Sequence, residues 1–97
     1  MMYPFLTLDD DTEITHSEMR PDGTVKVYIE KPDEKDCFHH ATFYLPGYVV
    51  SDVYGFTREE TERYLKIIQS VGYLILEFSR NGGFNRASVL KTTPSLQ

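Results

Sequence analysis

The sequence predicts a two-layer α+β domain, in which a small antiparallel sheet of three or four strands packs against one long C-terminal helix. Between residues 24 and 45, apolar and polar residues alternate in two runs, which is the pattern of half-buried strands. From residue 57 onward, apolar residues recur every three or four positions, as in an amphipathic helix. A sheet and a helix of this kind bury their apolar faces against each other.

The size and composition of the chain fit one domain. It has 97 residues, of which 40% are hydrophobic, enough for a modest core without metal or disulfide bonds. We expect a single domain over residues 1–90 and a flexible tail over residues 91–97. Fifteen acidic residues against ten scattered basic ones give a formal charge of −5, which disfavours a nucleic-acid partner because such binding needs basic patches. No cofactor is predicted.

Cysteine content and the first residues predict the compartment. Cys37 is the single cysteine and cannot form an internal disulfide, which favours a reducing environment. The first residues lack the basic segment, apolar run and small-residue site of a secretory signal. No apolar run approaches the ~18 residues that cross a bilayer. We therefore expect a cytoplasmic protein of a bacterium or a similar cell, with no membrane partner.

The first half of the chain predicts strands joined by turns. Residues 3–8 form a short strand or extended arm, which ends at a run of three aspartates. The clearest strand follows the Pro-Asp-Gly turn at residues 21–23 and has alternating valines and isoleucine. If the loop comprises those three residues, His16 lies opposite Tyr28. A two-residue Asp-Gly turn would reverse the faces of the strand before it.

Two further segments precede the helix. Residues 37–45, CFHHATFYL, predict a strand with Ala41, Phe43 and Leu45 facing the core. This strand ends at a Pro-Gly pair. Residues 48–56 fit either a fourth strand or an irregular crossing.

The helix has recognisable start and stop signals. Thr57 and Glu60 form a capping box, and Phe56 stands where a hydrophobic staple would be. We predict one helix over residues 57–81, with a kink at Gly72, because the Asn-Gly-Gly that begins at position 81 is a good C-cap. The alternative is that residues 70–78 form a buried strand.

Cys37, His39 and His40 invite a metal or catalytic interpretation. These residue types bind Zn²⁺ and carry out nucleophilic catalysis. However, adjacent histidines of a strand point to opposite faces, and the spacing of a strong zinc motif is missing. We predict no metal site and no catalytic site. The alternative function is a small metal-dependent or hydrolytic enzyme centred on these three residues.

The sheet face that the helix leaves open is the predicted binding site. Large aromatic side chains with polar tips are typical of association surfaces. The candidate residues of this face are His16, Tyr28, His40, Thr42 and Tyr44. They predict a non-enzymatic protein-interaction module, whose partner is another protein or a second copy in a homodimer.

The segment from Phe43-Tyr44-Leu45 through Tyr54-Gly55-Phe56 into a Glu-rich helix resembles a family of small bacterial domains of unknown function, number 4160 in its naming series. The similarity covers residues 14–82. The family's Pro-His-x-His-type motif has no counterpart in residues 23–31, so no role of those histidines is carried over. The resemblance implies an accessory or interaction protein, antitoxin-like or regulatory, of the kind encoded near toxin–antitoxin or regulatory genes.

Overall fold

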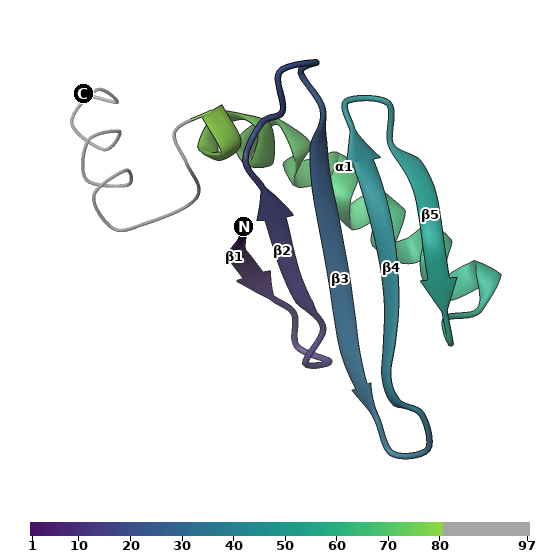
Figure 1. The fold of residues 1–97 in the computed structure, drawn as a ribbon. Coiled ribbons are helices and arrows are strands. Elements are labelled where there is room, and N and C mark those ends of the chain that lie inside the picture. The colour runs from purple at the N-terminus through teal and green to yellow at the C-terminus, as the bar shows by residue number, and fades with distance from the viewer. Residues whose placement is uncertain (81–97) are drawn as a thin grey trace.

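Five antiparallel strands and one helix make up the described part of the protein. The computed structural model describes residues 1–80. The strands pair in chain order and form one sheet, and α1 crosses obliquely behind one face of it (Figure 1). The elements are β1 (Met2–Thr7), β2 (Glu13–Ser17), β3 (Val25–Asp33), β4 (Cys37–Leu45), β5 (Val49–Tyr54) and α1 (Arg58–Arg80). The predicted α+β arrangement is confirmed, with five strands in place of three or four.

The additional strands are the two edges of the sheet. β1 pairs with β2, with Tyr3 opposite His16, and β5 pairs with β4, with Val50 opposite Phe43. In β5 five of the six residues are exposed and none is fully buried. An edge strand that is exposed on both faces shows no alternation of apolar and polar residues, which is why residues 48–56 were ambiguous in the sequence.

The hydrophobic core lies between α1 and the face of the sheet that it covers. The predicted inward residues of β3 and β4 are fully buried there, and Ile14 of β2 joins them. The buried apolar residues of the core are Ile14, Val25, Val27, Ile29, Ala41, Phe43, Leu45, Phe56, Tyr64, Ile68 and Ile75.

Among residues 1–80, α1 does not combine the length and the apolar character that a membrane-spanning helix needs.

The register of the β2–β3 hairpin differs from the one predicted for a three-residue loop. The N–H of Arg20 donates to the carbonyl of Thr24, which frames residues 21–23 as the loop. The ladder nevertheless pairs His16 with Val27, one residue away from the register that this loop would set.

The shift arises where the chain leaves the ladder. The N–H of Lys26 donates to the hydroxyl of Ser17 at 2.9 Å, and the N–H of Met19 donates to the carbonyl of Ser79 in α1. These bonds take the place of ladder bonds, and the pairing between β2 and β3 shifts by one residue across this segment. His16 is therefore 0% exposed on the covered face, so its predicted place on the open face beside Tyr28 was wrong.

The start of α1 follows the predicted capping box. The N–H of Thr57 donates to the carboxylate of Glu60 at 2.8 Å, and the N–H of Glu60 donates to the hydroxyl of Thr57 at 3.1 Å. Two backbone donors that have no partner inside the helix are thereby satisfied. The ring of Phe56 packs on Tyr64, with 5.0 Å between ring centroids.

The helix continues through Gly72, so residues 70–78 are helical and do not form a strand. Gly72 is buried where the hydroxyl of Tyr48 approaches the helix backbone, and a Cβ atom at this position would overlap that hydroxyl. The glycine makes room for Tyr48 between sheet and helix. The predicted C-cap at residues 81–83, the domain boundary at residue 90 and the tail at residues 91–97 lie outside the described residues.

Replacing Gly72 with alanine is expected to test this contact. Alanine favours a helix by about 1 kcal/mol over glycine, but in the native protein the added methyl displaces the ring of Tyr48 and cancels the gain. With Tyr48→Phe, the nearest ring atom stands 3.1 Å from the new Cβ, and we expect most of the gain to return. Urea unfolding of the native protein, the two single variants and the double variant gives the coupling free energy. The same effect of alanine in both backgrounds would contradict the assigned contact.

Candidate functional site

The open face of the sheet carries three rows of side chains. Paired residues of neighbouring strands lie on the same face, so each row runs across the strands. The acidic row contains Glu13, Glu30, His40 and Tyr54, the central row contains Thr15, Tyr28, Thr42 and Ser51, and the basic row contains Ser17, Lys26, Tyr44 and Val49.

An aromatic stack crosses the first two rows. The imidazole of His40 lies between two tyrosine rings, with its centroid 5.9 Å from that of Tyr28 and 5.5 Å from that of Tyr54. Both pairs are close to parallel, with interplanar angles of 26° and 19°. Within residues 1–80, the Nδ1 atom of His40 is buried and has no hydrogen-bond partner. The stack presents a flat aromatic surface that spans three strands.

Carboxylates flank one side of this stack. The hydroxyl of Tyr28 donates to Glu30 at 3.0 Å. Partial burial and this bond to a carboxylate raise the pKa of Tyr28 to about 12, so the hydroxyl remains a donor at neutral pH. A hollow of about 290 Å³ lies beside it, lined by Met2, Glu13, Thr15, Tyr28 and Glu30. This part of the face suits a cationic group.

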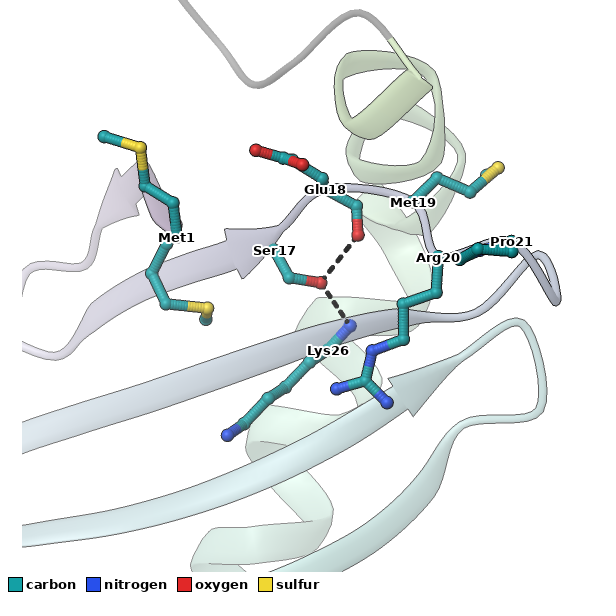
Figure 2. A pocket seen from close by; sticks show the side chains of 8 residues that line it. Met1, Ser17, Glu18, Met19, Arg20, Pro21 and Lys26 are labelled. Atoms are coloured by element: carbon teal, nitrogen blue, oxygen red, sulfur yellow. Dashed lines mark hydrogen bonds between the residues drawn. The ribbon is translucent and has the colours of Figure 1, made fainter.

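The opposite end of the face is basic. The guanidinium of Arg20 lies 5.4 Å from the centre of the Tyr44 ring, a cation–π arrangement. Figure 2 shows Arg20 and Lys26 at one side of a hollow of about 480 Å³, with Met1 across from them. The hydroxyl of Ser17 lies between the two sides, where it bonds the backbone of Lys26 and of Glu18. This end suits an anionic group.

The structure brings together most of the predicted face. Tyr28, His40 and Tyr44 lie half-buried on the open side. Thr42 lies between them but is only 2% exposed, so it supports its neighbours and offers little surface to a partner. His16 lies on the covered face, as described above.

Several residues of the face were missed in the sequence. Glu30 and Lys26 share the parity of Tyr28 in β3, and that alternation alone would have found them. Tyr54 and Val49 depend on β5 being a strand, which no local pattern settled. Both are at least half exposed.

His39, which shares β4 with His40, points to the other face and meets two aspartates. Its Nε2 atom lies 3.1 Å from Oδ2 of Asp36 and 3.5 Å from Oδ1 of Asp33. Cys37 is exposed at the start of β4. Cys37, His39 and His40, the centre of the alternative enzyme hypothesis, are therefore not one cluster. The two histidines lie on opposite faces of β4, as the alternation in the sequence predicted.

Asp33 is the last residue of β3 and Asp36 lies in the turn that follows it. The sequence predicts only a charged surface loop over residues 32–36. Asp33 accepts the backbone N–H groups of Lys35 and Asp36 through Oδ2, at 3.0 and 2.9 Å. The bond from the N–H of Asp36 has the largest effect on the pKa of Asp33. Together the two bonds outweigh the effect of desolvation and lower that pKa. Asp33 is therefore ionised at neutral pH, with its other oxygen toward His39.

A further charged group fastens the helix to the turn after β1. The hydroxyl of Tyr64 donates to Asp10 at 2.7 Å and lies 3.1 Å from the hydroxyl of buried Thr12. Desolvation would raise the pKa of Asp10, but its hydrogen bonds with Thr12 and Tyr64 and the charge of Lys31 lower it to about 2. The role of this carboxylate is structural.

Fold and face together define a two-layer α+β domain with an aromatic open face that is acidic at one end and basic at the other. The chain matches no family model, no curated protein and no solved structure. Its resemblance to domain family number 4160 stays a prediction.

Proposed function

We propose that this protein is a non-enzymatic interaction module of the cytoplasm, which forms a homodimer through the open face of its sheet. The observation that carries the proposal is the stacked Tyr28–His40–Tyr54 surface, flanked by charges of opposite sign. The exposed thiol of Cys37 suits a reducing compartment. In this proposal the accessory or regulatory role implied by the resemblance depends on the dimer.

Aromatic residues give the face its affinity in this proposal. Tyrosine is enriched at interfaces because its ring contributes apolar area and its hydroxyl finds a polar partner. Tyr28, Tyr44 and Tyr54 all lie on the open side, and Val49 adds an apolar side chain at the edge. The arrangement resembles the core of a small interface, with polar residues around it.

Charge complementarity supports a second copy as the partner. Glu30 and Lys26 stand on β3 at equal distances along the chain from Tyr28. Consider a two-fold axis that lies in the interface plane and runs along the central row, perpendicular to the strands. This axis would place the acidic row of one copy against the basic row of the other. Such an interface is isologous, so each Glu30–Lys26 contact occurs twice.

The area of the face is sufficient. Five strands at ~4.8 Å spacing give the width of the face, and the three rows together extend ~20 Å along the strands. The flat area is therefore roughly 500 Å² for each copy. Two such faces bury roughly 1,000 Å², which is the lower limit for a specific interface. The proposed dimer is therefore a weak or moderate one.

Charge reversal tests the proposal. We expect a concentration-dependent dimer of the native protein in sedimentation equilibrium. Lys26→Glu alone or Glu30→Lys alone should weaken it at least about tenfold, because like charges then face each other. The double variant should restore most of the affinity, since the reversed rows again match. Tyr44→Glu should also weaken the dimer.

The control is Lys66→Glu, which makes the same charge change at an exposed position of α1. It should leave the dimer unchanged. A strict monomer at every accessible concentration would contradict the proposal. A dimer that Lys26→Glu and Tyr44→Glu leave intact would place the interface elsewhere, for example at the exposed edge of β5, and would also contradict it.

A further inference from the structure

We propose that Asp33, Asp36 and His39 form a binding site for a divalent transition-metal ion, with Zn²⁺ as the ion of best fit. The three residues frame the turn between β3 and β4, and each places one ligand atom within 4.8 Å of the other two. The site lies away from the proposed dimer face, because His39 and His40 point to opposite sides of β4. It is independent of the proposed function.

The distances fit a common metal ion. The ligand atoms of all three residues lie within 4.8 Å of one another. A metal held at about 2.0–2.2 Å by nitrogen and oxygen ligands keeps neighbouring ligand atoms roughly 3.0–3.6 Å apart. The separations from Nε2 of His39 to the two carboxylate oxygens are 3.1 and 3.5 Å. Binding would need little rearrangement of these contacts.

The imidazole is held in place by its surroundings. Its side chain is 17% exposed, and the ring of Phe56 packs edge-on against it at 5.7 Å between centroids. Gly55 lies directly beside the ring, where any Cβ atom would overlap it. The Nε2 atom therefore points toward the aspartates, and a ligand of fixed orientation loses little freedom when a metal binds.

The Asp33 carboxylate is oriented in the same way. Its Oδ2 accepts two backbone N–H groups of the turn, and its Oδ1 faces His39. Hydrogen bonds of this kind from outside the ligand set orient the ligands of metal sites.

The chemistry of the three groups selects the class of ion. Two carboxylates within 4.8 Å of each other repel, and a divalent cation between them removes that repulsion. The imidazole favours Zn²⁺ and its neighbours over Mg²⁺ or Ca²⁺, which prefer oxygen alone. Three protein ligands would leave a coordination position for water.

Titration of the untagged full-length protein with Zn²⁺ tests the proposal. Calorimetry should give one ion per chain for the native protein. His39→Asn and Asp36→Asn should each weaken binding more than about tenfold, because each removes a ligand. The matched control is Glu34→Gln, which changes an exposed carboxylate of the same turn outside the three ligands and should leave binding unchanged.

A second measurement separates metal binding from a simple hydrogen-bonded turn. In NMR spectra, Zn²⁺ should shift the ring signals of His39 and leave those of buried His16 in place. Absence of one-to-one binding would overturn the proposal, as would equal loss in Glu34→Gln. If the His39 signals do not move while ions bind elsewhere, the three residues are a histidine–aspartate clamp and the proposal fails.

Discussion

Replacing Gly55 with alanine is expected to lower the free energy of unfolding by about 3 kcal/mol, from two additive causes. Gly55 has φ of +83°, in the left-handed region, where an L side chain costs roughly 1–2 kcal/mol. The new methyl would also overlap the His39 ring, which Phe56 prevents from moving freely, and overpacking of this kind costs about 1–3 kcal/mol. Urea unfolding measures the sum.

A second substitution separates the two causes. With His39→Ala as background the overlap disappears, so Gly55→Ala should cost only about 1 kcal/mol, from the backbone conformation alone. Gly47→Ala is the matched control, since its added methyl meets only Val49, at an ordinary 3.6 Å. An equal loss in both backgrounds would show that His39 does not occupy the space beside Gly55.

Acidification from pH 7.5 to pH 5 is expected to destabilise the native protein through His16, by up to about 2 kcal/mol. Burial lowers the pKa of His16 below its ordinary value of 6.5, against the opposing effect of its hydrogen bond with Ser17. The unfolded chain then binds more protons than the folded one. The stability contributed by neutral His16 is therefore complete above pH 6.5 and declines as the pH falls below it.

The geometry accounts for this sensitivity. Nδ1 of His16 lies 2.8 Å from the carbonyl oxygen of Ser17, whereas the buried Nε2 has no partner within residues 1–80. The rings of Tyr3 and Phe5 from β1 stand against the imidazole. A proton on Nε2 would place a charge among apolar groups without a hydrogen-bond acceptor.

The variant His16→Leu isolates this contribution. It keeps a side chain of similar volume but cannot titrate, so the fall in stability between pH 7.5 and pH 5 should shrink. The control His40→Asn removes a histidine from the open face and leaves His16 in place. Thermal unfolding at several pH values provides the measurement. If the pH dependence of His16→Leu equals that of the native protein, the assignment to His16 is wrong.

The predictable parts of this structure are those with strong local signals. Alternation identified β3 and β4 and their inward residues, and the Thr57–Glu60 pair located the start of α1 within one residue. The candidate face was partly predictable for the same reason, because Tyr28, His40 and Tyr44 share the outward parity of two confident strands. The resemblance to domain family number 4160 remains a prediction, and the function as a dimeric interaction module remains a proposal.

Parts that depend on distant neighbours were not predictable. The parity of β2 depended on the bond from Met19 to Ser79, which joins residues sixty positions apart, and so the placement of His16 was wrong. Residues 32–36 were interpreted only as a charged surface loop, because the sequence does not show how the turn directs the carboxylates of Asp33 and Asp36 to His39. Gly72 suggested a kink in the helix. The structure shows another role for this glycine, which is to make room for Tyr48 from the turn between β4 and β5.

The sequence by itself determined the two layers, the central strands and the helix, because periodicity and capping act within a few residues of the chain. Tertiary structure decided which face His16 occupies, that β1 and β5 complete the sheet, and that His39 meets Asp33 and Asp36. The physical reason is that a one-residue shift in register reverses every side chain of a strand. Such a shift is set by contacts between elements, which no stretch of sequence contains.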